Sequence, residues 1–329
     1  MKRISLIIPV YNAEAFLTEM VESVLSQEWE NLQILLSDDG STDGSLQLMT
    51  ALAQRDSRIA VVTGPNTGVS SARNRAIRLA DGDYIGFADS DDVMEPGYLK
   101  TLASILEESG ADMACCGFSR LYVRSGKQDG LPTEGHAKML VDRDGMARLM
   151  LKPDGYTTVM WNKLFRREAL TQPDGSLLLF DENLHIVEDG EYILRTGVQS
   201  AVFIPDRLYL YYVRSSGAMY GAVNKRKLTE PDARRKIVEL TKDLSQETRN
   251  LAKMKYQKGI RDLMFHAVID GDSDKVRFLL PELRTYRKEM FASPSLSMKE
   301  KLKYHIYYPI ICLNLRHTGR FLMDRLSGH

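Results

Sequence analysis

Three carboxylates fall within four positions at Asp89, Asp91 and Asp92, directly after the apolar run 84–87. A strand that ends in clustered acids offers a hard divalent cation the short, closely spaced oxygen ligands that it prefers. An isolated Asp-x-Asp could equally be a solvated turn before the helix expected near Pro96. The stretch is a candidate metal site, and the strength of this interpretation depends on the elements that position it.

Alternating strand and helix patterns surround this acidic stretch. Residues 4–10 form a continuous apolar run with β-branched side chains, which is typical of a strand buried on both faces of a parallel sheet. Residues 13–27 instead repeat apolar positions at helical spacing. The alternation predicts βαβ units and an α/β fold with a mainly parallel sheet flanked by helices. Strands are expected at 4–10, 32–36, 59–63, 83–88 and 112–118, and helices at 13–27, up to 55, at 70–79 and at 96–108.

Polar clusters follow four of these strands at their carboxyl ends, where an open α/β sheet binds its ligands. Each cluster alone could be a turn, a helix cap or a surface charge, but their convergence on one edge favours a ligand site. Arg73 among carboxylates suits a phosphate-bearing ligand, because a guanidinium pairs bidentately with phosphate. The chain has neither a P-loop nor a dinucleotide fingerprint after a strand. The four clusters are Tyr11-Asn12, Asp38-Asp39, 66–73 and 89–92.

The composition is that of an ordinary globular protein, with 43% hydrophobic and 27% charged residues among 329. Residues 1–220 hold 21 Lys and Arg against 31 Asp and Glu, whereas residues 221–329 hold 23 against 13, which suggests different roles for the two parts. The three cysteines form neither a disulfide framework nor a zinc-site spacing. The short apolar run after Met1 fits a strand better than a signal peptide, so we expect a cytoplasmic location.

Four motifs, in this order along the chain, resemble those of inverting family 2 glycosyltransferases of the GT-A fold, which use nucleotide-diphospho-sugars. The resemblance covers residues 3–120 and implies a Rossmann-like catalytic domain. The motifs are Ile-Ile-Pro-Val-Tyr-Asn from position 7, Ser-Asp-Asp-Gly-Ser-Thr-Asp-Gly-Ser from 37, Asn-Thr-Gly-Val-Ser-Ser-Ala-Arg-Asn from 66 and Ala-Asp-Ser-Asp-Asp from 88.

The resemblance assigns the donor nucleotide to these motifs. It implies that Pro9 and Tyr11 line the base and ribose pocket, and that Asp39 accepts the N3–H of a uracil-type base. Arg73 would lie near the base or the diphosphate. The other donor-binding candidates in the same motifs are Asn12, Asp38, Asn66, Asp89 and Ser90.

The resemblance also implies a divalent cation, Mn²⁺ or Mg²⁺, that bridges the donor diphosphate. Asp91 is its expected ligand, with Asp89 and Asp92 as further candidates. This agrees with the chemistry of sugar transfer, because a metal acting as a Lewis acid stabilises the charge that grows on the leaving diphosphate.

Sugar transfer further needs a base that deprotonates the acceptor hydroxyl. Family members commonly carry a Glu-Asp pair downstream, and Glu188-Asp189 fits that position. By this resemblance Asp189 is the base, and Glu188 is its neighbour or contacts the acceptor. The acids could also simply decorate the start of a helix, which the helix dipole favours.

The acceptor side is expected between residues 119 and 220. Residues 160–167 resemble the acceptor segment of the family, where Trp161 could stack on a sugar face or be buried beside a strand, and where Lys163 is a second candidate. Residues 119–140 lack periodicity and are interpreted as a variable acceptor loop. Arg214, after a strand expected at 208–213, could close over the diphosphate.

These patterns predict a catalytic domain over residues 1–220, with a donor half 1–118 and an acceptor half 119–220, followed by a basic helical region 221–329. Helices are expected from 231, at 251–269 and at 276–290, interrupted by Gly271 and Pro281.

The last part of the chain, 299–325, mixes basic and aromatic residues, and its apolar run 304–315 is too short to span a bilayer. It could lie on an anionic membrane surface, at the inner face of the plasma membrane, or pack on protein, either the catalytic domain or a second subunit. No nucleic-acid motif accompanies the charge.

The expected reaction is metal-dependent, single-displacement transfer of a sugar, from a UDP-sugar, with inversion. The acceptor would be a hydroxyl of a saccharide or lipid-linked saccharide in cell-surface polysaccharide synthesis. Two alternatives stay open. A nucleotidyltransferase would show a basic Gly-rich loop after the first strand, which Pro9-Val10-Tyr11-Asn12 is not. A non-catalytic module that keeps the nucleotide pocket is the other, although the intact Asp-x-Asp and the available base argue against it.

Overall fold

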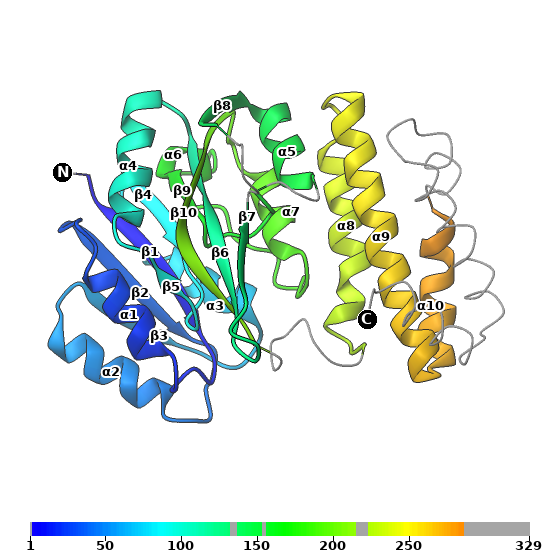
Figure 1. Ribbon diagram of the computed structural model, residues 1–329. Helices are drawn as coiled ribbons and strands as arrows, with labels where there is room; N and C mark the ends of the chain where they lie inside the picture. The colour runs from blue at the N-terminus through cyan, green and yellow to red at the C-terminus, as the bar shows by residue number, and fades with distance from the viewer. Residues whose placement is uncertain (1, 132–136, 153–155, 215–222, 286–329) are drawn as a thin grey trace. The chain divides into compact units, whose positions relative to one another are not determined.

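The computed structural model describes residues 2–131, 137–152, 156–214 and 223–285 (Figure 1). The chain forms two compact units. The first consists of Met1–Asn183 and Glu188–Gly217, and the second of Leu184–Val187 and Ala218–His329. The predicted tail 299–325, with its membrane hypothesis, lies outside the described residues.

The first unit is built on a mixed sheet whose first four strands are parallel, in the order β3-β2-β1-β4. Val10 in β1 pairs with Asp38 in β2, and Asp38 pairs with Thr63 in β3, so these three strands end level with one another. The loops that follow them therefore meet at one edge, as the sequence predicts. The bounds are β1 Ile4–Val10, β2 Leu32–Asp38, β3 Ile59–Thr63 and β4 Tyr84–Phe87.

The second half of the sheet departs from a simple parallel order. Strand β9 is inserted antiparallel between β4 and β6, and β10 then runs parallel to β6. The short strands β5, β7 and β8 are also antiparallel to their partners, so six of the ten strands in the described part of the chain share one direction. The bounds are β5 Val93–Met94, β6 Met113–Tyr122, β7 Gln128–Leu131, β8 Met139–Asp142, β9 Lys163–Arg166 and β10 Ser200–Val213.

The interpretation of residues 119–140 as a loop is wrong for its described part. This segment completes β6, forms β7 and begins β8. The cross-strand ion pair of Arg120 Nε with Asp129 Oδ1, at 2.6 Å, joins β6 to β7. Residues 119–122 of β6 and all of β7 are not fully buried, so they lack the apolar run that marks a core strand.

Helices cover both faces of the sheet (Figure 1). Alternate residues of β1, such as Leu6 and Ile8, share one apolar core with α1, α2 and α4. On the opposite face, Ser37 of β2 donates from Oγ to the carbonyl of Ala72 in α3, at 2.7 Å. The bounds are α1 Leu17–Leu25, α2 Ser45–Arg55, α3 Val69–Ile77, α4 Tyr98–Ser109, α5 Arg143–Leu151, α6 Arg167–Leu170 and α7 Glu188–Arg195.

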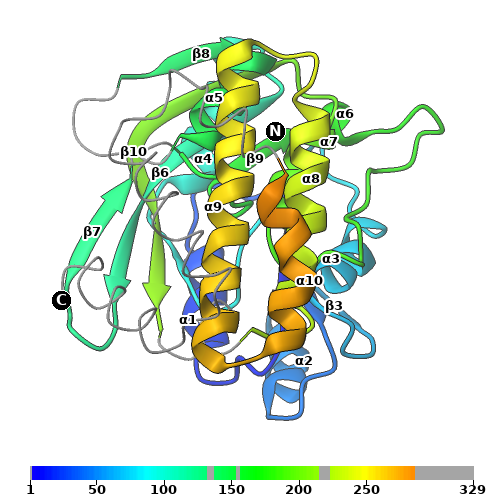
Figure 2. The ribbon, with the colours of Figure 1, turned by 90° about the vertical axis from the view of Figure 1, so that its right-hand side faces the viewer.

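The described residues 223–285 of the second unit are mainly helical, as predicted, and α9 lies beside both α8 and α10 (Figure 2). Gly271 ends α9 with a positive φ of 71°, a conformation that glycine adopts without a steric penalty. Pro281, expected to interrupt, instead lies inside α10. None of the described helices is long and apolar enough to cross a membrane. The bounds are η1 Lys227–Thr229, α8 Glu230–Leu240, α9 Gln246–Asp270 and α10 Ser273–Arg284.

Candidate active site

The loops after β1 and β2 are tied together at the carboxyl edge of the sheet. Asn12 has a positive φ of 49°, and its Oδ1 accepts a hydrogen bond from the backbone N–H of Thr42 at 2.8 Å. Pro9 is buried within β1, whereas the side chain of Tyr11 is 46% exposed. Of these predicted donor contacts, Tyr11 is the one that presents a ring to solvent.

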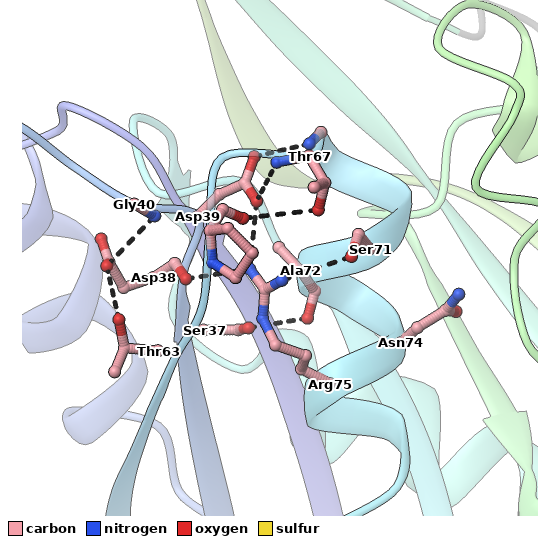
Figure 3. Close-up of polar contacts among 12 residues, drawn as sticks. Ser37, Asp38, Asp39, Gly40, Thr63, Thr67, Ser71, Ala72, Asn74 and Arg75 are labelled. Carbon is pink, nitrogen blue, oxygen red and sulfur yellow. Dashed lines mark hydrogen bonds and ion pairs between the residues drawn. The ribbon is translucent and has the colours of Figure 1, made fainter.

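Asp38 is a buried clamp between loops (Figure 3). Its carboxylate accepts from Thr63 Oγ1 at 2.9 Å and from the backbone N–H groups of Ser41 and Gly40 at 3.0 and 3.2 Å. Burial alone would raise the pKa of Asp38, but these hydrogen bonds outweigh it and hold the pKa below its ordinary value. Asp38 therefore shapes the edge of the sheet from inside.

Asp39 holds the start of α3 (Figure 3). Its Oδ1 accepts from the N–H of Thr67 at 3.2 Å and its Oδ2 from the N–H of Gly68 at 2.8 Å, and Arg75 pairs with Oδ1 at 3.0 Å. A carboxylate at a helix N-terminus is favoured by the helix dipole. Among the described residues Oδ2 accepts only one hydrogen bond, and a carboxylate oxygen can accept two. One acceptor position of Asp39 Oδ2 thus stays open.

Arg75 is a site residue that the sequence reasoning missed. Figure 3 shows it reaching from α3 toward Asp39, whereas Asn74 points away. Asn74 exchanges hydrogen bonds with the backbone of Phe180, at 2.8 and 3.0 Å. Residues two apart on a helix do not face each other, so Arg73 and Arg75 must serve different partners. That spacing is the signal that could have revealed Arg75.

Arg73 lies at the centre of three carboxylates. Its Nη1 pairs with Asp189 Oδ1 at 2.6 Å and Glu188 Oε1 at 3.5 Å, and its Nη2 pairs with Asp89 Oδ1 at 3.5 Å. The Arg73 side chain is only 4% exposed, and its guanidinium lies over the ring of Phe180 at 5.2 Å. Burial alone would lower the pKa of Arg73, but the three acids raise it. Arg73 therefore links the loop after β4 to α7.

The first two acids of α7, Glu188 and Asp189, have different surroundings. Asp189 is fixed from both sides, because its Oδ2 also accepts from the backbone N–H of Met160 at 3.1 Å. Burial and the neighbouring Asp189 raise the pKa of Glu188 to about 7, despite the opposing effect of Arg73. Val187, directly before this pair, has a φ of 67°, which is a strained conformation for a β-branched residue.

The loop 89–92 divides its acids between the interior and the surface. Asp92 is 1% exposed and accepts from Tyr209 Oη at 3.2 Å and from the N–H of Tyr212 at 3.0 Å. Asp91 points outward, with 40% of its side chain exposed, and pairs with Arg214 at 2.9 Å. Ser90 is buried. Strand β10 therefore fixes this loop through Tyr209 and Tyr212.

The described residues contain no group of three His, Cys, Asp or Glu side chains that could hold a metal ion by themselves. Asp92, one of the predicted ligands, is turned inward. Asp91 and Asp89 nevertheless fit a cation that takes its remaining ligands from phosphate, because their side chains are 40% and 33% exposed. Mg²⁺ in phosphate-transferring sites is bound in this way, through one or two carboxylates plus the substrate.

The two predicted acceptor residues lie beneath the surface. Trp161 is 5% exposed and stacks on Tyr209 and Tyr211, with ring centroids 4.5 and 5.6 Å away. Lys163 is fully buried, and its Nζ donates to the carbonyl of Val159 at 2.7 Å. Burial lowers the pKa of Lys163. Both side chains support the sheet from inside, whereas Asn66 is exposed on the loop after β3.

These acids and arginines lie at the carboxyl ends of parallel strands, which is where open α/β sheets bind their ligands. Residues 5–172 match the model of the family described as "Glycosyl transferase family 2". The chain belongs to this family.

Two curated relatives illustrate the family. The chain is 31% identical over 212 residues to the uncharacterized glycosyltransferase EpsJ of Bacillus subtilis, which covers 63% of this chain and 60% of EpsJ. It is 27% identical over 219 residues to the minor teichoic acid biosynthesis protein GgaB of the same organism, which covers 65% of this chain and 23% of GgaB. The chain thus spans less than two thirds of either relative.

Solved structures share the fold. The S. aureus TarS fragment 1–349 in complex with UDP superposes with a TM-score of 0.70 at 19% identity, covering 99% of this chain and 92% of that one. The mannosyltransferase PcManGT from Pyrobaculum calidifontis, in complex with GDP-Man and Mn²⁺, gives 0.52 at 15% identity, covering 100% and 88%. These likenesses confirm the GT-A fold.

Proposed function

We propose that this protein is a glycosyltransferase that moves a sugar from a UDP-sugar to a hydroxyl of a saccharide or lipid-linked saccharide, with inversion, in cell-surface polysaccharide synthesis. The cluster around Arg73 carries the proposal. One guanidinium contacts Asp89 on the donor edge and Asp189 on α7, so groups for donor binding and for proton abstraction share one site. The teichoic acid relative supports the pathway, and the UDP complex of TarS supports the nucleotide.

The donor would bind along the loops after β1, β2 and β4. Tyr11 offers an exposed ring to the base, and Asp39 offers its remaining acceptor position to the base N3–H. Asp91 and Asp89 would hold Mn²⁺ or Mg²⁺ against the diphosphate. Such a cation, when bound, supplies Lewis-acid stabilisation of the leaving diphosphate. Arg214 adds a guanidinium that suits the same phosphates.

The acceptor hydroxyl would lose its proton to the acids of α7. Asp189 is the proposed base, because Arg73 and the Met160 N–H hold its carboxylate in one orientation. Glu188 is a second candidate, since a pKa of about 7 matches proton abstraction near neutral pH. In either case the carboxylate takes the proton while the hydroxyl oxygen attacks the anomeric carbon, and the bond between that carbon and the diphosphate oxygen breaks so that UDP leaves. A single displacement of this kind inverts the configuration.

Calorimetric titration of UDP, GDP and CDP, with and without Mn²⁺, tests the donor assignment. We expect UDP to bind in the presence of Mn²⁺ and the Asp91→Ala variant to lose this metal-dependent binding. Asp129→Ala is the matched control, because it removes an acid that pairs with Arg120 on the strands β6 and β7. UDP binding that is indifferent to both metal and Asp91 would contradict the assignment.

The two alternative functions, a non-catalytic binding module and a nucleotidyltransferase, predict different reaction products. A non-catalytic binding module would bind UDP without releasing it from any UDP-sugar, and a nucleotidyltransferase would produce a nucleotide-sugar from a nucleoside triphosphate. Incubation with a panel of UDP-sugars, with UDP release as the readout, therefore separates them. We expect UDP release that is slow alone and rises when a saccharide acceptor is added.

A further inference from the structure

Arg214 forms an ion pair with Asp91, the outward-facing carboxylate of the loop 89–92. Its Nη1 donates to Asp91 Oδ2 at 2.9 Å and to the Asp91 carbonyl at 2.6 Å. Arg214 is the only charged partner of Asp91 within the part of the chain that the structure describes. The guanidinium therefore sits on the carboxylate that best fits a divalent cation.

The guanidinium is held in a built pocket. Its carbon lies 4.1 Å from the ring centroid of Phe16 in the loop before α1 and 4.7 Å from that of Tyr212 in β10. Tyr212 is fixed in turn, because its hydroxyl donates to Glu19 at 3.1 Å and its N–H donates to Asp92 at 3.0 Å. The Arg214 side chain is consequently only 13% exposed. Cation–π contacts favour a guanidinium at this place.

We propose that Arg214 is an exchangeable counter-ion of Asp91. It neutralises the carboxylate in the unloaded site, and it moves to the diphosphate when donor and divalent cation bind together. This inference rests on the proposed function and adds the coupling between metal and donor.

Charge balance gives the reason for the coupling. The pair of Asp91 and Arg214 is neutral, so a divalent cation that arrives alone must take Asp91 from Arg214 and leave that guanidinium beside it without a counter-charge. A sugar-linked diphosphate brings two negative charges with the cation and accepts the guanidinium bidentately. Arg214 thus weakens binding of the cation alone and strengthens binding of the cation with the nucleotide. By linkage, each ligand then raises the affinity of the other by the same factor.

Mn²⁺ binding to the full chain, followed through the EPR signal of free Mn²⁺, tests this directly. We expect Arg214→Met to bind Mn²⁺ about tenfold more tightly than wild type without nucleotide, within the usual range of such couplings. The same variant should show a UDP-induced gain in Mn²⁺ affinity that is about tenfold smaller than in wild type. Asp91→Asn added to Arg214→Met should abolish the tighter binding.

Two further variants serve as a control and as an alternative to Arg214→Met. Arg58→Met removes an ion pair with Asp56 at 2.8 Å before β3, at the opposite edge of the sheet, and should leave Mn²⁺ binding unchanged. Phe16→Leu removes the ring that packs on the Arg214 guanidinium but changes no charge. It should also tighten Mn²⁺ binding without nucleotide, and it replaces Arg214→Met in the test if Arg214→Met does not fold.

Two outcomes would overturn the exchange. Unchanged Mn²⁺ affinity of the nucleotide-free Arg214→Met protein would show that Arg214 does not compete for Asp91. If Arg214→Met lost UDP binding equally in EDTA and in Mn²⁺, Arg214 would replace the cation permanently. Failure of wild type to bind UDP would refute the proposed function. The Mn²⁺ titration without nucleotide would still decide whether Arg214 competes with the cation for Asp91.

Discussion

Glu188 should make the first unit less stable as the pH rises toward neutrality. Its pKa of about 7 lies above the ordinary value of 4.5, so the folded chain binds this proton more tightly than the unfolded chain. The stability that protonation provides is fully present below about pH 4.5 and is lost as the pH rises through 7. Glu188→Gln, which resembles the protonated side chain, should remove this loss.

The magnitude follows from the two pKa values. A difference between 4.5 and about 7 corresponds to about 3 kcal/mol, at about 1.36 kcal/mol for each pKa unit. Only 13% of the Glu188 side chain is exposed, so little of this is screened by solvent. We therefore expect Glu188→Gln to be more stable than wild type by about 2 to 3 kcal/mol at pH 8 and nearly equal to it at pH 4.5.

Urea unfolding in metal-free buffer at both pH values is the assay. Both tryptophans of the chain, Trp29 and Trp161, lie in the first unit, so their fluorescence reports that unit alone. The exposed Glu108 provides a control, because Glu108→Gln alters an ion pair with Lys138 on the surface and should change stability little at either pH. A stabilisation by Glu188→Gln that is the same at pH 4.5 and pH 8 would refute the reasoning.

Three other changes have defined outcomes. Asp189→Asn should retain UDP binding and lose sugar transfer, measured by calorimetry and UDP release, because the amide cannot accept the proton. Arg75→Met should cost about 3 kcal/mol in urea unfolding, because it leaves Asp39 buried without its cation. Removal of residues 299–329 should lower association with anionic lipid vesicles in a flotation assay, if this basic segment binds the membrane surface.

Each of these predictions has its own control and contrary result. Parallel loss of UDP binding and transfer in Asp189→Asn would remove its role as base. The exposed Arg78, the C-cap residue of α3, offers Arg78→Met as a control that should stay within about 0.5 kcal/mol of wild type. An equally small effect of Arg75→Met would contradict the buried pair. Neutral vesicles control the truncation, and unchanged flotation on anionic vesicles would discard the membrane hypothesis.

The local sequence determined the frame of this protein. Strand β1 has the expected bounds, because a strand buried on both faces needs uninterrupted apolar side chains. Strand β3 lies at the end of the sheet and is partly exposed, and it also has the expected bounds, because β-branched residues favour a strand. Parallel strands joined by helices all end on the same side, so the order of motifs along the chain already places Tyr11, Asp38 and Asp91 at one edge. The family, the GT-A fold and the helical second unit follow from such short-range patterns.

Only the tertiary structure decided which acids of the site face the interior, the surface or Arg73. The sequence offers both Asp91 and Asp92 as candidate metal ligands, but Tyr209, 117 residues from Asp92, decides that Asp92 is the inward one. Likewise, Asp189 meets Arg73 across 116 residues, through strands whose order includes the antiparallel insertion of β9. Side-chain direction and burial depend on partners distant in the chain. Local periodicity can therefore place a carboxylate at the edge, while only the packed sheet determines whether it binds a ligand or a neighbour.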